Sequence, residues 1–374
     1  MIYLDNAATT FPKPQYVYEA LDYANRNLAF NAGRGSYKKS KEVSQMIYET
    51  RAKVASFVKK DANSVVFSSS ATESLNLIIN GIDFQDGDIV YVSPFEHNAI
   101  IRPLYNIKKS IKIEILILPF DKKTWLPDVN KIDDMFSIKK PRAVFLSQVS
   151  NVTGLQLDYQ SIFILSKKYG ALNILDSAQA FGIINPNLTN CDFCVFAGHK
   201  SLYASFGIAG FIINTNYILN ITKSGGNGSD SLNHDMPNKG YERYESGSPN
   251  SIAIYGLNKS IDWLKNEKIV NYEKEITEYL IDKLSKIYKI KLYIPDTKNI
   301  VGIVSFNIDG YLADEVASIL NDEFDIEVRS GYHCAPFVHE FINSLDFKGT
   351  VRISIGAFTK ISDIDALVSA IQSF

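Results

Sequence analysis

The stretch ALNILDSAQAFGIINPNLTNCDFCVFAGHK, residues 171–200, decides the fold. It contains two short apolar runs of strand length, LNIL and FCVF, and both lead into polar residues. Asp176 follows the first run directly, and Lys200 comes shortly after the second. In parallel sheets, ligands collect at the carboxyl ends of the strands. We therefore expect Asp176 and Lys200 to lie at one binding edge of a sheet.

The pattern of short apolar runs continues on both sides of this stretch. From about residue 40 to 220, strand-length runs such as SVVFSSS, DIVYVS and AVFLSQVS are each followed by a segment of helical periodicity. This alternation predicts an α/β fold, with a mostly parallel sheet flanked by helices on both faces. After about residue 240, long helical segments lead into mixed strands and helices. We expect a large cofactor-binding domain over 13–245 and a smaller α+β domain made of 1–12 and 246–374.

The composition narrows the class of function. The 374 residues suit one large and one small domain, at ~100–200 residues per domain. The net charge of −2 favours neither nucleic acid nor an anionic membrane as a partner. We see neither a signal peptide nor an apolar run near the ~18 residues of a membrane span. Three cysteines are too few for a disulfide framework, so we expect a cytoplasmic protein.

Lys200 and Asp176 suggest cofactor chemistry. A lysine at a strand end, in a loop with glycine and histidine, suggests a Schiff-base lysine, although a solvated surface lysine is the commoner case. Asp176 favours the first interpretation, because a partly buried carboxylate needs a cation or several donors. A protonated pyridine nitrogen is such a cation, whereas the alternative is a strand-end aspartate that caps the next turn. Gln179 could bond an oxygen on the same ring.

Three further segments follow predicted strands. In SSSATESLN (68–76), free N–H groups at a helix start could hold a phosphate, although a plain cap with a capping glutamate fits equally well. In SPFEHNA (93–99), His97 could stack on a flat cofactor, or be a capping or core histidine. Asn151 in QVSNVTG lies at another strand end, where an ordinary loop asparagine is the alternative.

In this order, the motifs resemble the class V aminotransferase family of fold-type-I pyridoxal-phosphate enzymes. More narrowly, they resemble its cysteine desulfurases and selenocysteine lyases. The resemblance runs from YLDNAATT at residue 3 to GTVRISIGAF near residue 358. Each motif alone is weak, but the ordered set of YLDNAATT, ATESLN, EHN, SNVTG, DSAQ, GHK, RYESGSPN, RSGYHCA and VRISIG is specific.

The resemblance implies a role for each matched position. Lys200 would bind pyridoxal 5'-phosphate as a Schiff base, Asp176 would pair with the pyridine nitrogen, and Gln179 would contact the ring hydroxyl. The remaining cofactor-binding residues would be His97 on the ring, Asn151 beside it, and Ala71, Thr72, His199 and Ser248 at the phosphate. Because Ser248 matches a residue that reaches across from the other subunit, the resemblance implies a homodimer. The substrate-binding residues would be Ala8, Asn151, Arg329 and Arg352.

Arg352 matches the arginine that holds the substrate carboxylate, which a guanidinium can do through two parallel hydrogen bonds. The alternative is a strand residue paired with an acid of the small domain.

Cys334, in VRSGYHCAPF (328–337), falls on the family's catalytic cysteine. The resemblance implies that Lys200, Cys334 and His97 convert L-cysteine to L-alanine and leave the sulfur on Cys334 as a persulfide. A reactive thiolate needs positive charge nearby, which Arg329 and His333 could provide. The alternative is a buried, inert thiol. For the pair Cys191 and Cys194, packing in an apolar strand is the preferred interpretation, since no second ligand pair for a metal is present.

Some positions depart from the family pattern, and other functions stay open. Ala197 stands where relatives usually have serine, Tyr37 stands where they often have histidine, and His339 has no assigned role. The alternatives are a selenocysteine lyase, a class V aminotransferase or β-lyase on a small amino acid, and a non-catalytic scaffold that binds the cofactor. A sulfur-acceptor protein is an expected partner, since iron–sulfur cluster assembly, tRNA thiolation and selenium metabolism all draw on this family.

Overall fold

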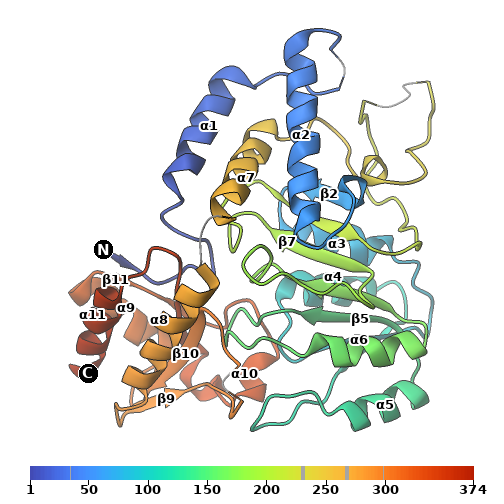
Figure 1. The fold of residues 1–374 in the computed structure, drawn as a ribbon. Coiled ribbons are helices and arrows are strands. Elements are labelled where there is room, and N and C mark those ends of the chain that lie inside the picture. Colours follow the sequence, from blue (N-terminus) through green and yellow to red (C-terminus); the bar gives the residue numbers. More distant parts are fainter. Residues whose placement is uncertain (34, 229–231, 266–268, 298) are drawn as a thin grey trace.

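The computed structural model describes residues 1–33, 35–228, 232–265, 269–297 and 299–374. Its centre is a seven-stranded sheet (Figure 1). In spatial order the strands are β2 (Val65–Ser68), β8 (Ala209–Ile213), β7 (Phe193–Ala197), β6 (Leu172–Asp176), β5 (Pro141–Ser147), β3 (Ile89–Val92) and β4 (Glu114–Ile117). Strands β7 to β4 are parallel, and β8 is antiparallel to both its neighbours. The predicted α/β fold with a mostly parallel sheet is confirmed.

Helices cover both faces of this sheet. They are α1 (Gln15–Asn27), α2 (Lys38–Ser56), α3 (Ala71–Gly81), α4 (Asn98–Ile107), α5 (Val129–Ile138), α6 (Tyr159–Lys168) and α7 (Ser251–Leu264). Helices α3 and α4 pack on one face, and the other five contribute to the core on the opposite face. Along β7, Val195 packs in the core beneath α3 and α4, and Cys194 and Phe196 pack in the core on the opposite face. Successive side chains of a strand point to opposite faces of the sheet.

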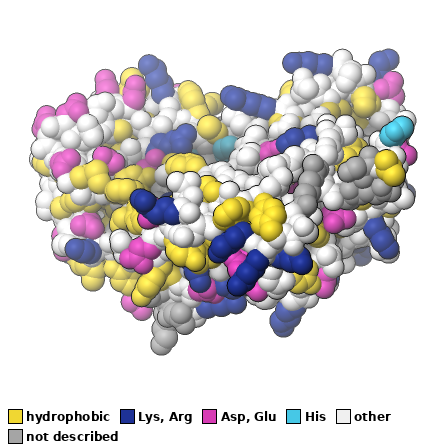
Figure 2. Space-filling view, turned by 90° about the horizontal axis from the view of Figure 1, so that it is seen from above, with side chains coloured by type: hydrophobic (Ala, Val, Ile, Leu, Met, Phe, Trp, Pro, Cys, Tyr) yellow, Lys and Arg dark blue, Asp and Glu magenta, His cyan; other side chains and the backbone are white. Residues whose placement is uncertain are grey.

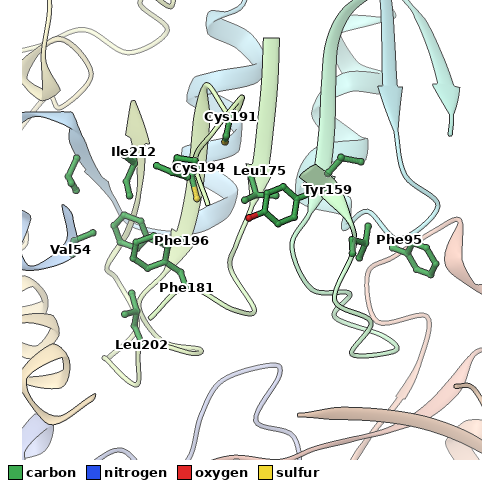
Figure 3. Close-up of a cluster of buried hydrophobic side chains, with 14 of the residues drawn as sticks. Val54, Phe95, Tyr159, Leu175, Phe181, Cys191, Cys194, Phe196, Leu202 and Ile212 are labelled. Carbon is green, nitrogen blue, oxygen red and sulfur yellow. The ribbon is translucent and has the colours of Figure 1, made fainter. Parts of the chain in front are cut away.

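Figure 3 shows part of the core on the second face, where Cys194 lies with Leu175, Phe196 and Ile212. Cys191 and Cys194 are both buried, and burial raises the pKa of each thiol. The packing role predicted for this pair is confirmed. Since β7 is buried on both faces, its sequence is a continuous apolar run.

The C-terminal part builds a second, antiparallel sheet. Its strands, in spatial order, are β12 (Arg329–Gly331), β13 (Thr350–Ser354), β10 (Ile303–Ile308) and β9 (Ile290–Leu292). Its helices are α8 (Ile269–Leu284), α9 (Ala313–Phe324), α10 (Val338–Phe341) and α11 (Ile361–Gln372).

The N-terminal strand β1 (Ile2–Tyr3) pairs in parallel with β11 (Ile326–Glu327), so the N-terminus lies beside the C-terminal part (Figure 1). Helix α7 packs on α1 and α2. The division into domains at residues 12 and 245 stays a prediction.

The described surface carries charges of both signs. Figure 2 shows basic and acidic side chains interspersed on one face, in keeping with the net charge of −2. None of the helices in the described part of the chain has the length and apolar character of a membrane span. Within the same residues, no three His, Cys, Asp or Glu side chains gather in a way that could hold a metal ion.

Candidate active site

A pocket opens at the carboxyl ends of β5, β6 and β7. It is lined by Ser70, Ala71, Thr72, His97, Ala99, Ser147, Val149, Asn151, Asp176, Ala178, Gln179, Ala197, His199 and Lys200. All the residues predicted to bind a cofactor are in this set except Ser248, which lines a separate cavity near α2. The β-α connections bring these side chains together, because each parallel strand delivers its following loop to the same edge of the sheet.

Lys200 and Asp176 are the charged groups at the centre of this pocket. The side-chain nitrogen of Lys200 makes no hydrogen bond to a described residue, and burial lowers its pKa to about 8 against the opposing charge of Asp176. The Asp176 carboxyl accepts one hydrogen bond, from the Ala178 N–H at 3.0 Å, and burial raises its pKa. The pocket therefore holds an amine that can be neutral near pH 8 and a carboxylate with room for another donor.

The first turn of α3 borders the pocket and is capped. The Ser70 hydroxyl accepts from the Glu73 N–H at 3.1 Å, and the Glu73 carboxylate accepts from the Ser69 N–H at 2.8 Å. The predicted capping glutamate is thus present. The N–H groups of Ala71 and Thr72 nevertheless have no acceptor among the described residues. These two donors at a helix N-terminus can still bind an anion.

His199 also lines the pocket. Its ring stacks on Phe206, with centroids 4.5 Å apart, and its Nδ1 is buried without a hydrogen-bond partner. Burial lowers the pKa of His199 to about 3, so the ring is neutral. A buried ring nitrogen without a partner beside two free N–H groups fits a phosphate, because a bound oxygen would satisfy all three.

His97 caps α4. Its Nδ1 accepts from the Ala99 N–H at 3.0 Å, so Nε2 carries the ring proton. Burial and nearby cations lower its pKa to about 3. His97 is thus a neutral ring on the wall of the pocket, held in orientation by its capping bond. Capping, one of the predicted alternatives, is compatible with stacking of the ring on a cofactor.

The segment around Cys334 is fixed to this edge of the sheet by backbone contacts. The Asn98 backbone N–H donates to the Cys334 carbonyl at 2.7 Å, and the Asn151 side-chain Nδ2 donates to the His333 carbonyl at 2.7 Å. His333 and Cys334 have φ of 46° and 56°, which turns the chain sharply. Cys334 is exposed, and Arg329 Nη2 lies 3.9 Å from its Sγ.

The positive charge expected from His333 is absent. Its ring points into the small sheet, where Nε2 lies 2.9 Å from the Thr350 carbonyl. Burial and the nearby charge of Arg352 hold the pKa of His333 well below its usual value, so the ring is neutral. Arg329 is therefore the cation beside the thiol, and the expectation for His333 was wrong.

Arg352 is almost wholly buried, 1% exposed, between the two parts of the chain. Its Nη1 donates to the Asn151 carbonyl at 2.9 Å, and its Nη2 pairs with Asp5 at 2.5 Å. Its Nε is buried without a partner. Both interpretations of Arg352 thus find support, because it has an acidic partner and still keeps one free donor.

The other predicted substrate contacts lie at the rim. Gln179 Nε2 donates to the Ala7 carbonyl at 3.0 Å, which fixes the turn that contains Ala8. Arg329 faces Arg352 across β12 and β13. Of the four predicted substrate-binding residues, only Asn151 lines the pocket itself; Ala8, Arg329 and Arg352 do not.

Sequence reasoning missed two groups, the buried Glu96 and the half-buried Lys13. The Glu96 carboxyl is fully buried and accepts from the Ser147 N–H at 2.9 Å and the Ser147 hydroxyl at 2.7 Å. Burial raises its pKa to about 8. Lys13 Nζ donates to the His199 carbonyl at 2.8 Å, and burial lowers its pKa to about 7. The only sequence signal for Glu96 was its position before His97, and Lys13 gave none.

His339, left without a role by the sequence, is buried. Its Nδ1 lies 2.8 Å from the Ser344 hydroxyl, and its ring packs edge-on against Tyr332. It is a packing residue of the segment that follows Cys334.

The chain resembles known proteins over its whole length. The family profile for aminotransferase class-V matches residues 2–367. A probable cysteine desulfurase of Methanothermobacter thermautotrophicus is 29% identical, and the alignment covers 99% of this chain and 94% of that protein. A cysteine desulfurase of Wigglesworthia glossinidia brevipalpis is 30% identical, covering 99% of this chain and 92% of that protein.

Solved structures are similar in the same way. The apo cysteine desulfurase of Thermococcus onnurineus superposes with a TM-score of 0.90 at 27% identity, covering 100% of this chain and 94% of that one. The cysteine desulfurase CsdA of Escherichia coli superposes with a TM-score of 0.86 at 25% identity, covering 99% and 94%.

Proposed function

The chain belongs to the aminotransferase class-V family, and from this premise we propose that it is a pyridoxal-phosphate-dependent cysteine desulfurase. It converts L-cysteine to L-alanine and takes up the sulfur on Cys334 as a persulfide. One observation carries the proposal: the only exposed cysteine among the three is held by backbone bonds beside a pocket that contains Lys200 and Asp176. An aminotransferase needs the pocket but has no use for that thiol.

The residues present fit pyridoxal phosphate. Lys200 would hold the aldehyde carbon, Asp176 the pyridine nitrogen, and the free N–H groups of Ala71 and Thr72 the phosphate, together with His199. When bound, this cofactor supplies a sink for the electrons released at the substrate Cα. Ala197 contributes no hydroxyl to the pocket, so the phosphate would be bound by the backbone donors, the Thr72 hydroxyl and His199.

The chain's own groups account for the remaining steps. Arg352 holds the substrate carboxylate through its free Nε. The Lys200 amine, released when the substrate amine takes its place, can be neutral near pH 8 and takes the proton from Cα as a general base. The Cys334 thiolate, beside the Arg329 guanidinium, attacks the substrate sulfur. The S–S bond forms as the substrate Cβ–S bond breaks, and a proton added at Cβ, with the return of a proton to Cα, yields alanine.

Two partners belong to the proposal. We propose a homodimer, in which the separate location of Ser248 is consistent with a contact to the other subunit's phosphate. The persulfide is then passed to a sulfur acceptor, in iron–sulfur cluster assembly or a related pathway, in the cytoplasm.

The test is product analysis with L-cysteine and a thiol reductant. We expect the wild type to form alanine and sulfide in equal amounts, and Cys334→Ala to lose nearly all sulfide release while keeping the cofactor absorbance. Sulfide with pyruvate in place of alanine, from both proteins, would instead indicate an eliminating β-lyase. Consumption of a keto acid without sulfide would indicate an aminotransferase, and preference for selenocysteine in competition would indicate a lyase for that substrate.

A further inference from the structure

A second, open groove begins where the cofactor pocket ends. It encloses about 630 Å³ between α3 and α4, and Cys334 lies on its wall. Thr72, His97 and Ala99 line both the pocket and the groove. Cys334 therefore lies on the wall of an open groove that shares three residues with the pocket.

The groove is polar along its length. On α3, Thr72, Asn76 and Asn80 are spaced four residues apart, which puts them on one face of the helix. Each asparagine amide nitrogen donates to the backbone carbonyl one turn before it, at 2.8 Å. The side-chain amides are thus held in a row beside the groove. The Asn76 oxygen also accepts from the Asn80 amide at 3.4 Å, whereas the Asn80 oxygen accepts no hydrogen bond from a described residue.

The opposite wall is basic. Arg102 and Lys109 line it, both are exposed, and neither makes an ion pair or side-chain hydrogen bond with any residue in the described ranges. No aspartate or glutamate is among the described residues that line the groove. Lys108, on the same turn as Lys109, adds to the positive charge near the wall, with its ammonium 5.8 Å from the Tyr105 ring.

From this arrangement we propose that the groove docks an acidic, extended segment of an acceptor protein that carries a cysteine to Cys334. The inference rests on the proposed function, since a persulfide on an exposed cysteine needs an acceptor. The acceptor thiolate attacks the outer sulfur of the persulfide, a new S–S bond forms on the acceptor, and Cys334 leaves as a thiolate. No electrons are gained or lost overall.

The dimensions set the length of the segment. From Thr72 to Asn80 the α3 wall runs about 12 Å, at ~1.5 Å per residue. An extended chain covers that distance with about four residues, at ~3.3 Å each. On the opposite wall, Asn98, whose N–H binds the Cys334 carbonyl, precedes Lys109 by eleven residues, or about 16 Å. The carboxylates that meet Arg102 and Lys109 should therefore lie within about five residues of the acceptor cysteine.

Thiol–disulfide exchange at Cys334 tests the groove without requiring turnover. The probes are three short peptides with one central cysteine, activated as its mixed disulfide with thionitrobenzoate and flanked by glutamate, glutamine or lysine. Attack by the Cys334 thiolate forms a protein–peptide disulfide and releases coloured thionitrobenzoate. Cys191 and Cys194 are buried, so the signal reports Cys334, and Cys334→Ala gives the background.

At low salt we expect the glutamate peptide to react about tenfold faster than the glutamine peptide, and the lysine peptide to react most slowly. The double variant Arg102→Glu/Lys109→Glu should abolish or reverse this order. The matched control Lys140→Glu/Lys168→Glu makes the same change in net charge at exposed residues outside the groove and should preserve the order.

Equal rates for the three peptides with the wild type would overturn the inference, as would equal effects of the two double variants. A change from dimer to monomer in Arg102→Glu/Lys109→Glu, measured by light scattering, would also overturn it, because a second copy of the chain would then occupy the groove. Alanine formation with dithiothreitol tests the proposed function separately. If alanine forms while peptide discrimination is absent, only the groove proposal is refuted. If alanine does not form while discrimination persists, the desulfurase activity is refuted, and with it the sulfur-acceptor role of the docked segment.

Discussion

Replacing Arg352 by lysine tests the substrate site most directly. Arg352 uses Nη1 for the Asn151 carbonyl and Nη2 for Asp5, which leaves Nε for a ligand. A lysine ammonium keeps the charge, but its donors sit on one atom and cannot span three separated acceptors. We therefore expect Arg352→Lys to keep the Asp5 pair and to lose the hydrogen bond to the substrate carboxylate.

The magnitude follows from that one bond. A hydrogen bond between charged groups is worth about 1.5–3 kcal/mol, and each ~1.4 kcal/mol is a factor of ten. The value of kcat/KM for L-cysteine should fall about 10- to 150-fold. Because the carboxylate is held alike in the bound substrate and in the transition state, the change should appear mainly in KM.

Sulfide release with a thiol reductant should be measured with both L-cysteine and cysteamine, which lacks the carboxylate. The wild type should prefer L-cysteine by about the same factor that the variant loses, and the variant should have little preference left. Arg26→Lys, at an exposed pair on α1, is the control. A variant within twofold of the wild type, with intact preference for L-cysteine, would refute the assignment of Arg352.

Three other measurements follow from buried charges. Burial lowers the pKa of Lys200 to about 8. The rate at which the apoprotein takes up pyridoxal phosphate, measured by absorbance, should therefore increase as the pH rises through 8 and then level off. A rate that does not change with pH would contradict a role for the neutral amine. Arg51 is buried between Phe67 and Tyr241 and paired with Glu245, so Arg51→Met should lower the free energy of unfolding in urea by about 3–5 kcal/mol. The exposed-pair variant Lys139→Met should cost less than about 1 kcal/mol, and equal costs would refute the reasoning. The Glu96 pKa is raised from about 4.5 to about 8 on folding, so the folded protein holds an extra proton between these values and stability falls as the pH rises through that window. Glu96→Gln should flatten the fall, and an unchanged urea midpoint profile would show that Glu96 does not titrate in this way.

Much of the pocket could be predicted because ligands bind at the carboxyl ends of parallel strands. Asp176 and Lys200 each follow a short apolar run, and parallel pairing of β6 and β7 brings those run ends to one edge. Alternation along the chain was therefore enough to predict this edge of the sheet. The resemblance to a family added a role for each position, but these roles stay predictions.

The features that could not be predicted depend on side-chain direction. Two successive residues with positive φ turn the His333 ring away from Cys334 and toward Thr350, which its place in the sequence does not reveal. Glu96 has the appearance of an ordinary acid near a helix start, yet packing buries it completely. The groove combines residues of α3 and α4 with Cys334 from the turn that follows β12, so no single stretch of sequence contains it.

The pairing of β1 with β11 has a consequence for how the protein is made. A ribosome that adds roughly 5–20 residues per second needs roughly 15–65 s to go from Ile2 to Ile326. All seven strands of the large sheet are complete by Ile213, well before that. The sheet edge that holds Lys200 can therefore assemble before β11, the partner strand of β1, has been synthesised. Asp5, among the first residues translated, meets Arg352 only when almost the whole chain has been synthesised.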